Sequence, residues 1–200
     1  MRAVSACHNI RCLMIKNLSF YRASAESIKF LRELPKLSSV KFCKLENITS
    51  SAFCALFEIP HTEYLRSIHL SACDGLCEQV VEIIAGSCPH LLKLTIHQPK
   101  ATEEQLIKSE GILYLVSKCT KIQLLDLRYM HISIGQVLLE IKLYLPGLKE
   151  FKYSSNSNSP NDGDSLNIIY YHSCIKLKNF NIFLECNRHM DIYLHGIRVQ

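Results

Sequence analysis

Apolar residues recur along this chain as a triplet, in which the second member follows the first by three residues and the third follows the second by two. The seven copies are Ile10-Leu13-Ile15, Leu37-Val40-Phe42, Leu65-Ile68-Leu70, Leu91-Leu94-Ile96, Ile122-Leu125-Leu127, Leu148-Phe151-Tyr153 and Leu177-Phe180-Ile182. Successive first members are 27, 28, 26, 31, 26 and 29 residues apart. A self-similar pattern of this period predicts a chain built from stacked structural units.

Each unit is predicted to contain one strand and one helix. Apolar and polar positions alternate at the end of each triplet, which is the period of a strand with one buried face. Between triplets the apolar spacing is helical, as in residues 80–84, 112–116 and 137–141. We therefore predict an α/β leucine-rich-repeat solenoid over residues 1–184. It would be a curved horseshoe of about seven repeats, with parallel strands on the concave face and helices on the convex face.

Three segments depart from this regularity. Residues 154–164 contain no apolar side chain, and we interpret them as a flexible loop inside the sixth repeat rather than as a binding or phosphorylation loop. Residues 98–104 predict a loop that ends at a helix N-cap, Thr102. Residues 185–200 are interpreted as a C-terminal tail or an incomplete repeat.

The cysteines follow the repeat instead of forming a disulfide framework. In four repeats a cysteine lies three residues before the first apolar member of the triplet, namely Cys7, Cys88, Cys119 and Cys174. The same position holds Leu34, Thr62 and Leu145 in the other repeats. A free cysteine packs as a small apolar residue, so this position is predicted to be buried and its thiols reduced. Reduced thiols favour an intracellular protein, cytoplasmic or nuclear.

The strand half of the repeat resembles the cysteine-containing repeats of the F-box/LRR protein family. Residues 88–96 (CPHLLKLTI) and 119–127 (CTKIQLLDL) match that family's strand, and residues 48–50 (ITS) match its helix start. The resemblance covers about residues 7–184. It implies the substrate-recognition repeats of a ubiquitin-ligase receptor, which bind a protein while other subunits transfer ubiquitin. The ribonuclease-inhibitor-like repeats, found in standalone interaction or inhibitor modules, have a similar length and are the alternative.

The F-box that defines the family is not visible, because Cys7 already belongs to the first strand. We expect the chain to be either a fragment or short isoform of a longer receptor, or a protein made of repeats alone. In a longer form that carries an F-box, the resemblance implies a Skp-type adaptor and a cullin as partners.

Motifs that support catalysis, cofactor binding or metal binding are missing. The sequence has no Gly-x-Ser-x-Gly elbow, phosphate-binding glycine loop or His-Glu-x-x-His helix. The pairs Cys73-x3-Cys77 and Cys186-x2-His189 each lack the second pair of a structural zinc site. No stretch approaches the roughly 18 apolar residues of a transmembrane helix. We therefore predict a protein that is not an enzyme, holds no cofactor or metal, and does not cross a membrane.

The predicted concave face is basic. Among the positions between the apolar anchors, nine are lysine or arginine and only Asp126 and Glu150 are acidic, which leaves 14 of the 23 bases and 16 of the 18 acids for the rest of the chain. The candidate partner-binding residues are Lys16, Lys41, Arg66, His69, Lys93, His97, Arg128, Lys149 and Lys152. Such a face favours an acidic or phosphorylated protein segment as the partner. Simple solvation of exposed strand positions by lysine and arginine is the alternative. The aromatic platform typical of single-strand nucleic-acid binders is missing, which argues against nucleic acid.

Overall fold

The computed structural model describes residues 9–20, 34–58, 62–99, 102, 105–130, 132, 134–155, 167–171, 181–185, 192–194 and 197–199. The helices and strands in chain order are β1 (Cys12–Ser19), β2 (Ser39–Glu46), α2 (Ser50–Phe57), the short 3-10 helix η2 (Thr62–Tyr64), β3 (Ser67–Ser71), α3 (Glu78–Ser87), β4 (Lys93–His97), α4 (Ser109–Lys118), β5 (Leu124–Met130), α5 (Ile134–Tyr144), β6 (Glu150–Ser155), β7 (Asn167–Tyr171), β8 (Asn181–Glu185), β9 (Ile192–Leu194) and β10 (Ile197–Val199).

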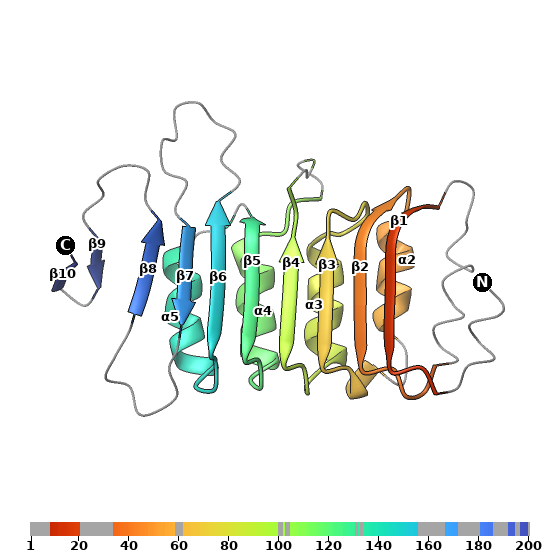
Figure 1. Cartoon of the computed structure of the whole chain (residues 1–200), viewed down its shortest axis with the longest axis horizontal. Helices are drawn as coiled ribbons and strands as arrows, with labels where there is room; N and C mark the ends of the chain where they lie inside the picture. The colour runs from red at the N-terminus through yellow and green to blue at the C-terminus, as the bar shows by residue number, and fades with distance from the viewer. Residues whose placement is uncertain are drawn as a thin grey trace.

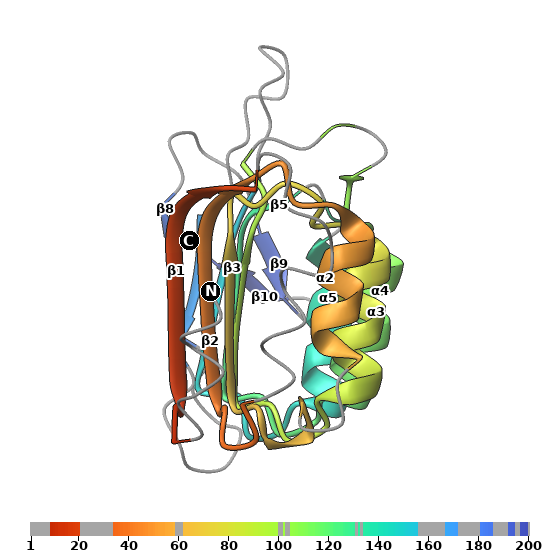
Figure 2. The same cartoon turned by 90° about the vertical axis from the view of Figure 1, so that its right-hand side faces the viewer.

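Six parallel strands, β1 to β6, lie side by side in chain order (Figure 1). Figure 2 shows helices α2 to α5 stacked on one side of this sheet. The prediction of an α/β chain with parallel strands and intervening helices is confirmed. The sequential order is compatible with a solenoid. We call the side of β1–β6 that points away from these helices the open face.

The apolar triplets set the register of the sheet. Their middle members are successive pairing partners from β1 to β6: Leu13, Val40, Ile68, Leu94, Leu125 and Phe151. Five of these six, from Val40 to Phe151, are buried in the layer between sheet and helices, and Leu13 at the first strand is partly buried. In the same layer the rings of Phe42 on β2 and Phe53 on α2 meet edge to face at 6.3 Å. The phase of the triplet therefore fixes which side of each strand faces the core.

The position before each strand is buried, as predicted. Leu34, Thr62, Cys88, Cys119 and Leu145 occupy it in the described repeats, and each is at most 7% exposed. Cys88 and Cys119 are free thiols, like the other described cysteines. Cys7 and Cys174 lie outside the described residues.

Helix α4 begins at Ser109, later than the predicted N-cap at Thr102 implied. Gln105 lies in a 3-10 turn, and its backbone N–H donates to the carbonyl oxygen of Thr102 (2.9 Å). The buried Gln98 amide donates from Nε2 to the carbonyl oxygens of Leu76 (2.9 Å) and Gln105 (2.6 Å), and its Oε1 accepts from the Ile107 backbone N–H (3.3 Å). These bonds tie Gln98 to the backbone of residues 105–107, directly before the start of α4. The helix begins where a carboxylate is available, since Glu78 of α3 accepts from the backbone N–H of Gly111 (3.0 Å).

The sheet also differs from the prediction after β6. Strand β7 pairs antiparallel with β6, and β8, which contains Ile182 of the seventh triplet, pairs antiparallel with β7. The sequence of β7, NIIYY, is rich in the β-branched and aromatic residues that favour strands, and it separates the seventh triplet from the sixth. Ser154 and Ser155 of the predicted polar loop belong to β6, whereas residues 156–164 lie outside the described residues. In the predicted tail, β9 and β10 form a two-stranded antiparallel sheet.

A second regularity appears only in the backbone. Asn17, Lys44, Ala72 and Tyr129 have left-handed conformations with φ between 50° and 63°, and each lies near the carboxyl end of a strand or directly after it. Between β5 and β6 the register shifts at this point, from Arg128 to Met130. A left-handed residue costs about 1–2 kcal/mol when it is not glycine, so its recurrence indicates a turn that the fold requires.

Among the described helices, none combines the length and the apolar character that crossing a bilayer requires.

Candidate binding face

The open face carries rows of side chains that run across the strands, because alternate residues of a strand point to opposite sides. The first row is Cys12, Ser39, Ser67, Lys93, Leu124 and Glu150. The second row is Met14, Lys41, His69, Thr95, Asp126 and Lys152. The third row is Lys16, Cys43, Ser71 and His97, and Arg128 lies at the same end of β5. No described helix covers these rows (Figure 2).

Most of the predicted partner-binding residues lie in these rows, namely Lys16, Lys41, His69, Lys93, His97, Arg128 and Lys152. The remaining two, Arg66 and Lys149, directly precede β3 and β6. Arg66 turns back onto its own loop, where Nη1 donates to the carbonyl oxygens of Glu63 (2.9 Å) and Leu65 (3.2 Å). Lys149 is exposed. Arg66 therefore has fewer donors to offer a partner than the lysines of the rows.

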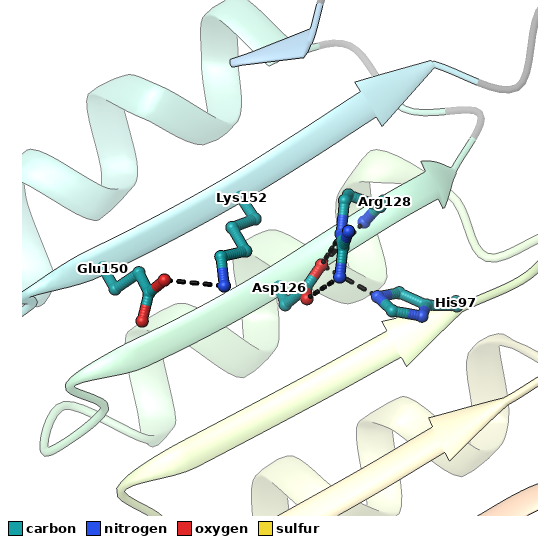
Figure 3. Close-up of polar contacts among 5 residues, drawn as sticks. All are labelled: His97, Asp126, Arg128, Glu150 and Lys152. Atoms are coloured by element: carbon teal, nitrogen blue, oxygen red, sulfur yellow. Dashed lines mark hydrogen bonds and ion pairs between the residues drawn. The ribbon is translucent and has the colours of Figure 1, made fainter. Parts of the chain in front are cut away.

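A polar network on the open face is centred on Asp126, as Figure 3 shows. Asp126 Oδ1 lies 2.8 Å from Nε2 of His97 on the neighbouring strand β4. Arg128, on the same strand as Asp126, donates from Nε to Oδ1 (2.9 Å) and from Nη2 to Oδ2 (2.8 Å). The backbone N–H of Arg128 adds a longer bond to Oδ1 (3.3 Å). Both carboxylate oxygens are thus engaged in charge-assisted contacts.

Asp126 is 4% exposed, although it lies on the side of the sheet without helices. Burial alone would raise the pKa of its carboxyl, but the hydrogen bonds from His97 and Arg128 outweigh burial and hold that pKa well below its ordinary value. The hydrogen bond with Asp126 also raises the pKa of Arg128. The network is therefore a fixed ion pair with a histidine attached, at neutral pH.

Aromatic rings surround this network. The His97 ring meets His69 and Tyr129 edge to face, with ring centroids 5.8 Å apart in both cases. Burial and the neighbouring charge of Lys41 lower the pKa of His69 from 6.5 to about 4. His69 is consequently neutral at pH 7 and contributes no charge to the face.

Charge is distributed unevenly over the open face. On β5 and β6 each base has an acid two residues earlier on its own strand: Arg128 pairs with Asp126, and Lys152 Nζ lies 2.6 Å from Glu150 Oε1. On β1, β2 and β4, Lys16, Lys41 and Lys93 form no ion pair with another described residue. We call β1–β4 with these three lysines the basic half of the open face, and β5–β6 the neutral half.

No protein-family model matches this sequence, and no curated protein matches it either. The residues of the open face are therefore the basis for inferring function. Within the described part of the chain, no three histidine, cysteine, aspartate or glutamate side chains are grouped so that they could hold a metal ion.

The sequence did not reveal the Asp126 network, because Asp126 was counted only as one of the two acids on the predicted concave face. One signal was present in the sequence: Asp126 and Arg128 are two residues apart on a predicted strand and therefore share a face. The partnership with His97 required the register between β4 and β5, which pairs Thr95 with Asp126.

Proposed function

We propose that this chain is a non-enzymatic protein-binding scaffold made of leucine-rich repeats, which captures an acidic protein segment on the basic half of its open face. The observation that carries the proposal is that Lys16, Lys41 and Lys93 belong by register to the rows of the open face and have no acidic partner among the described residues. The helices lie on the other side of the sheet (Figure 2). Uncompensated charge on an uncovered face attracts a partner of opposite charge.

Four observations support the assignment of repeats. The triplet recurs every 26 to 31 residues in the sequence. Its middle members pair with one another across the strands. The cysteine position before each strand is buried, and the left-handed residue recurs near the strand ends. Units that repeat in this way bury their apolar faces against their neighbours and leave one extended face for a partner.

The resemblance to F-box/LRR proteins extends the proposal to ubiquitin ligases. The scaffold would supply the substrate-recognition part, and a longer form with an F-box would join it to a Skp-type adaptor and a cullin. Affinity capture of the tagged chain from cells, followed by mass spectrometry, tests this part. Recovery of the adaptor and the cullin supports it, and recovery of acidic proteins alone leaves a standalone binding module.

Electrostatic capture is tested with a fluorescein-labelled peptide of ten glutamates, whose binding is followed by fluorescence anisotropy and stopped flow. The triple variant Lys16→Gln, Lys41→Gln, Lys93→Gln removes the charge of the basic half. An exposed ion pair contributes about 0.2–1 kcal/mol, so the loss of three pairs should weaken affinity by at least about three-fold, mostly through slower association. The dependence of affinity on salt should weaken as well.

The matched control removes three lysines outside the open face: Lys108→Gln, Lys118→Gln and Lys121→Gln. All three are exposed, and they lie before α4, at its end and in the turn that follows it. This control has the same net charge as the first variant. Equal losses in the two triple variants would show that only net charge matters and would refute the assignment of the basic half.

A further inference from the structure

A shallow pocket of about 290 Å³ lies at the amino-terminal ends of β1 and β2. The described residues that line it are Arg11, Pro35, Lys36, Ser38 and Tyr64. Arg11 directly precedes β1, Ser38 directly precedes β2, and Tyr64 ends the short helix η2 before β3. Three successive strand entries therefore contribute to one pocket.

Backbone hydrogen bonds between the strand entries hold the pocket walls in place. The carbonyl oxygen of Arg11 accepts from the backbone N–H (2.8 Å) and the hydroxyl (3.1 Å) of Ser38. The carbonyl oxygen of Ser38 in turn accepts from the backbone N–H of Arg66 (2.7 Å). Lys36 Nζ donates to Asn9 Oδ1 (2.7 Å), which restrains its long side chain. A pocket with restrained walls loses little entropy when a ligand enters it.

The lining combines an apolar floor with positive charge. The Pro35 ring and the Tyr64 side chain, which is 51% exposed, supply apolar surface. Arg11 and Lys36 supply two cations, and none of the described lining residues is acidic. A side chain with a short aliphatic stem and a terminal anion matches both parts, since the stem packs on the rings while the anion meets the cations.

We propose that this pocket anchors a glutamate side chain of the acidic segment that binds the open face. This inference rests on the proposed function and adds a subsite to it. A short path along β2 joins the pocket to the basic half, because Ser38 directly precedes this strand and lies three residues before Lys41, about 10 Å at 3.3 Å per residue. Lys16 pairs with Cys43, two residues further along the same strand. An extended acidic segment can therefore occupy the pocket and meet both lysines at once.

The test uses the ten-glutamate peptide, which spans about 33 Å when extended and so covers the whole path. The variant Tyr64→Ala removes the aromatic wall of the pocket without changing any charge. We expect about three- to five-fold weaker binding with an unchanged salt dependence, because the loss is one of apolar contact. Its matched control is Tyr114→Ala, which removes a tyrosine of similar exposure (44%) from helix α4.

A second pair of variants tests the charge in the pocket. Arg11→Gln should weaken binding by about two- to five-fold and reduce the salt dependence, since one ion pair is lost. Lys118→Gln is the matched control, because it also removes one positive charge but lies at the end of α4 and does not line the pocket. It should change binding less than Arg11→Gln. Far-UV circular dichroism of each variant confirms that the fold is retained.

The outcomes separate the pocket from the proposed function. Losses for Tyr64→Ala and Arg11→Gln that exceed those of their controls support the glutamate subsite. If the peptide binds but both pocket variants behave like their controls, the subsite is wrong while capture by the open face stands. If the unmodified chain does not bind the peptide even at low salt, both the proposed function and the subsite fail.

Discussion

Replacing Asp126 by asparagine removes one negative charge from the open face with almost no change in shape. The carboxylate accepts from His97 Nε2 at 2.8 Å and from two nitrogens of Arg128 at 2.9 and 2.8 Å. An asparagine keeps one acceptor oxygen and places an amide N–H₂ against one of these donors. Removing one partner of a buried ion pair costs about 3–5 kcal/mol, and a charged hydrogen bond contributes about 1.5–3 kcal/mol. The Arg128 side chain is 40% exposed, so water weakens its part of the ion pair. We therefore expect Asp126→Asn to lower the free energy of unfolding by about 2–3 kcal/mol.

Glu150→Gln is a matched control on the adjacent strand. It removes the same charge from the same face, but among the described residues Glu150 forms one ion pair, with Lys152, and both side chains are about a quarter exposed (26% and 27%). Water screens this pair, so its loss should cost about 0–1 kcal/mol. The difference in stability loss between the two variants gives the stabilisation that Asp126 gains from its burial and from its additional hydrogen-bond donors.

Urea denaturation followed by far-UV circular dichroism at pH 7 gives the free energy of unfolding of each variant. The pH dependence supplies a second check. Because the folded-state pKa of Asp126 lies below its ordinary value of 3.8, its stabilisation is complete above that value and is lost as the pH falls below it. The gap between the unmodified chain and Asp126→Asn should therefore narrow below about pH 4. A loss for Asp126→Asn that equals that for Glu150→Gln would refute the assignment of a stabilising buried network.

Three other predictions follow from the structure. Gly75→Ala should destabilise the chain by about 2 kcal/mol or more, because φ is +70° at this residue and a Cβ would lie 2.4 Å from the Ile48 carbonyl oxygen. Gly86→Ala, where a Cβ meets open space in helix α3, should instead stabilise the chain by up to about 1 kcal/mol. Urea titration of both variants checks this. Burial raises the pKa of Cys88 and Cys119 to about 12, so a thiol reagent at pH 8 should label exposed Cys12 first and these two only after unfolding, as peptide mass mapping would show. Binding of the glutamate peptide should tighten between pH 7 and pH 5. A bound carboxylate raises the pKa of His69, which burial and the Lys41 charge hold at about 4 in the free chain, and the protonated ring then attracts the peptide. An identical pH dependence in His69→Gln would contradict this.

The sequence predicted the phase of the sheet and the content of its core. Alternation within each triplet placed Val40, Ile68 and Leu94 on one side of their strands, and all three are buried and paired in register. The same reasoning placed Cys88 and Cys119 in a buried position. These predictions succeed because the side on which a strand residue lies depends only on its position along the strand, which is a local property of the chain.

The open face shows what only the tertiary structure decided. The sequence identified Lys41, Arg128 and Lys152 as equivalent bases of one face, yet Arg128 and Lys152 are paired with acids, and Lys41 is not paired with any described acid. The burial of Asp126 depends on the register that brings His97 beside it, and the pocket at Arg11 and Tyr64 depends on three strand entries meeting at one edge. Likewise, α4 begins at Ser109 because the Gln98 side chain engages the backbone before it. Periodicity encodes which side of an element is buried, whereas ion pairs, pockets and helix starts depend on contacts between segments far apart in the chain, which form only after the strands have paired.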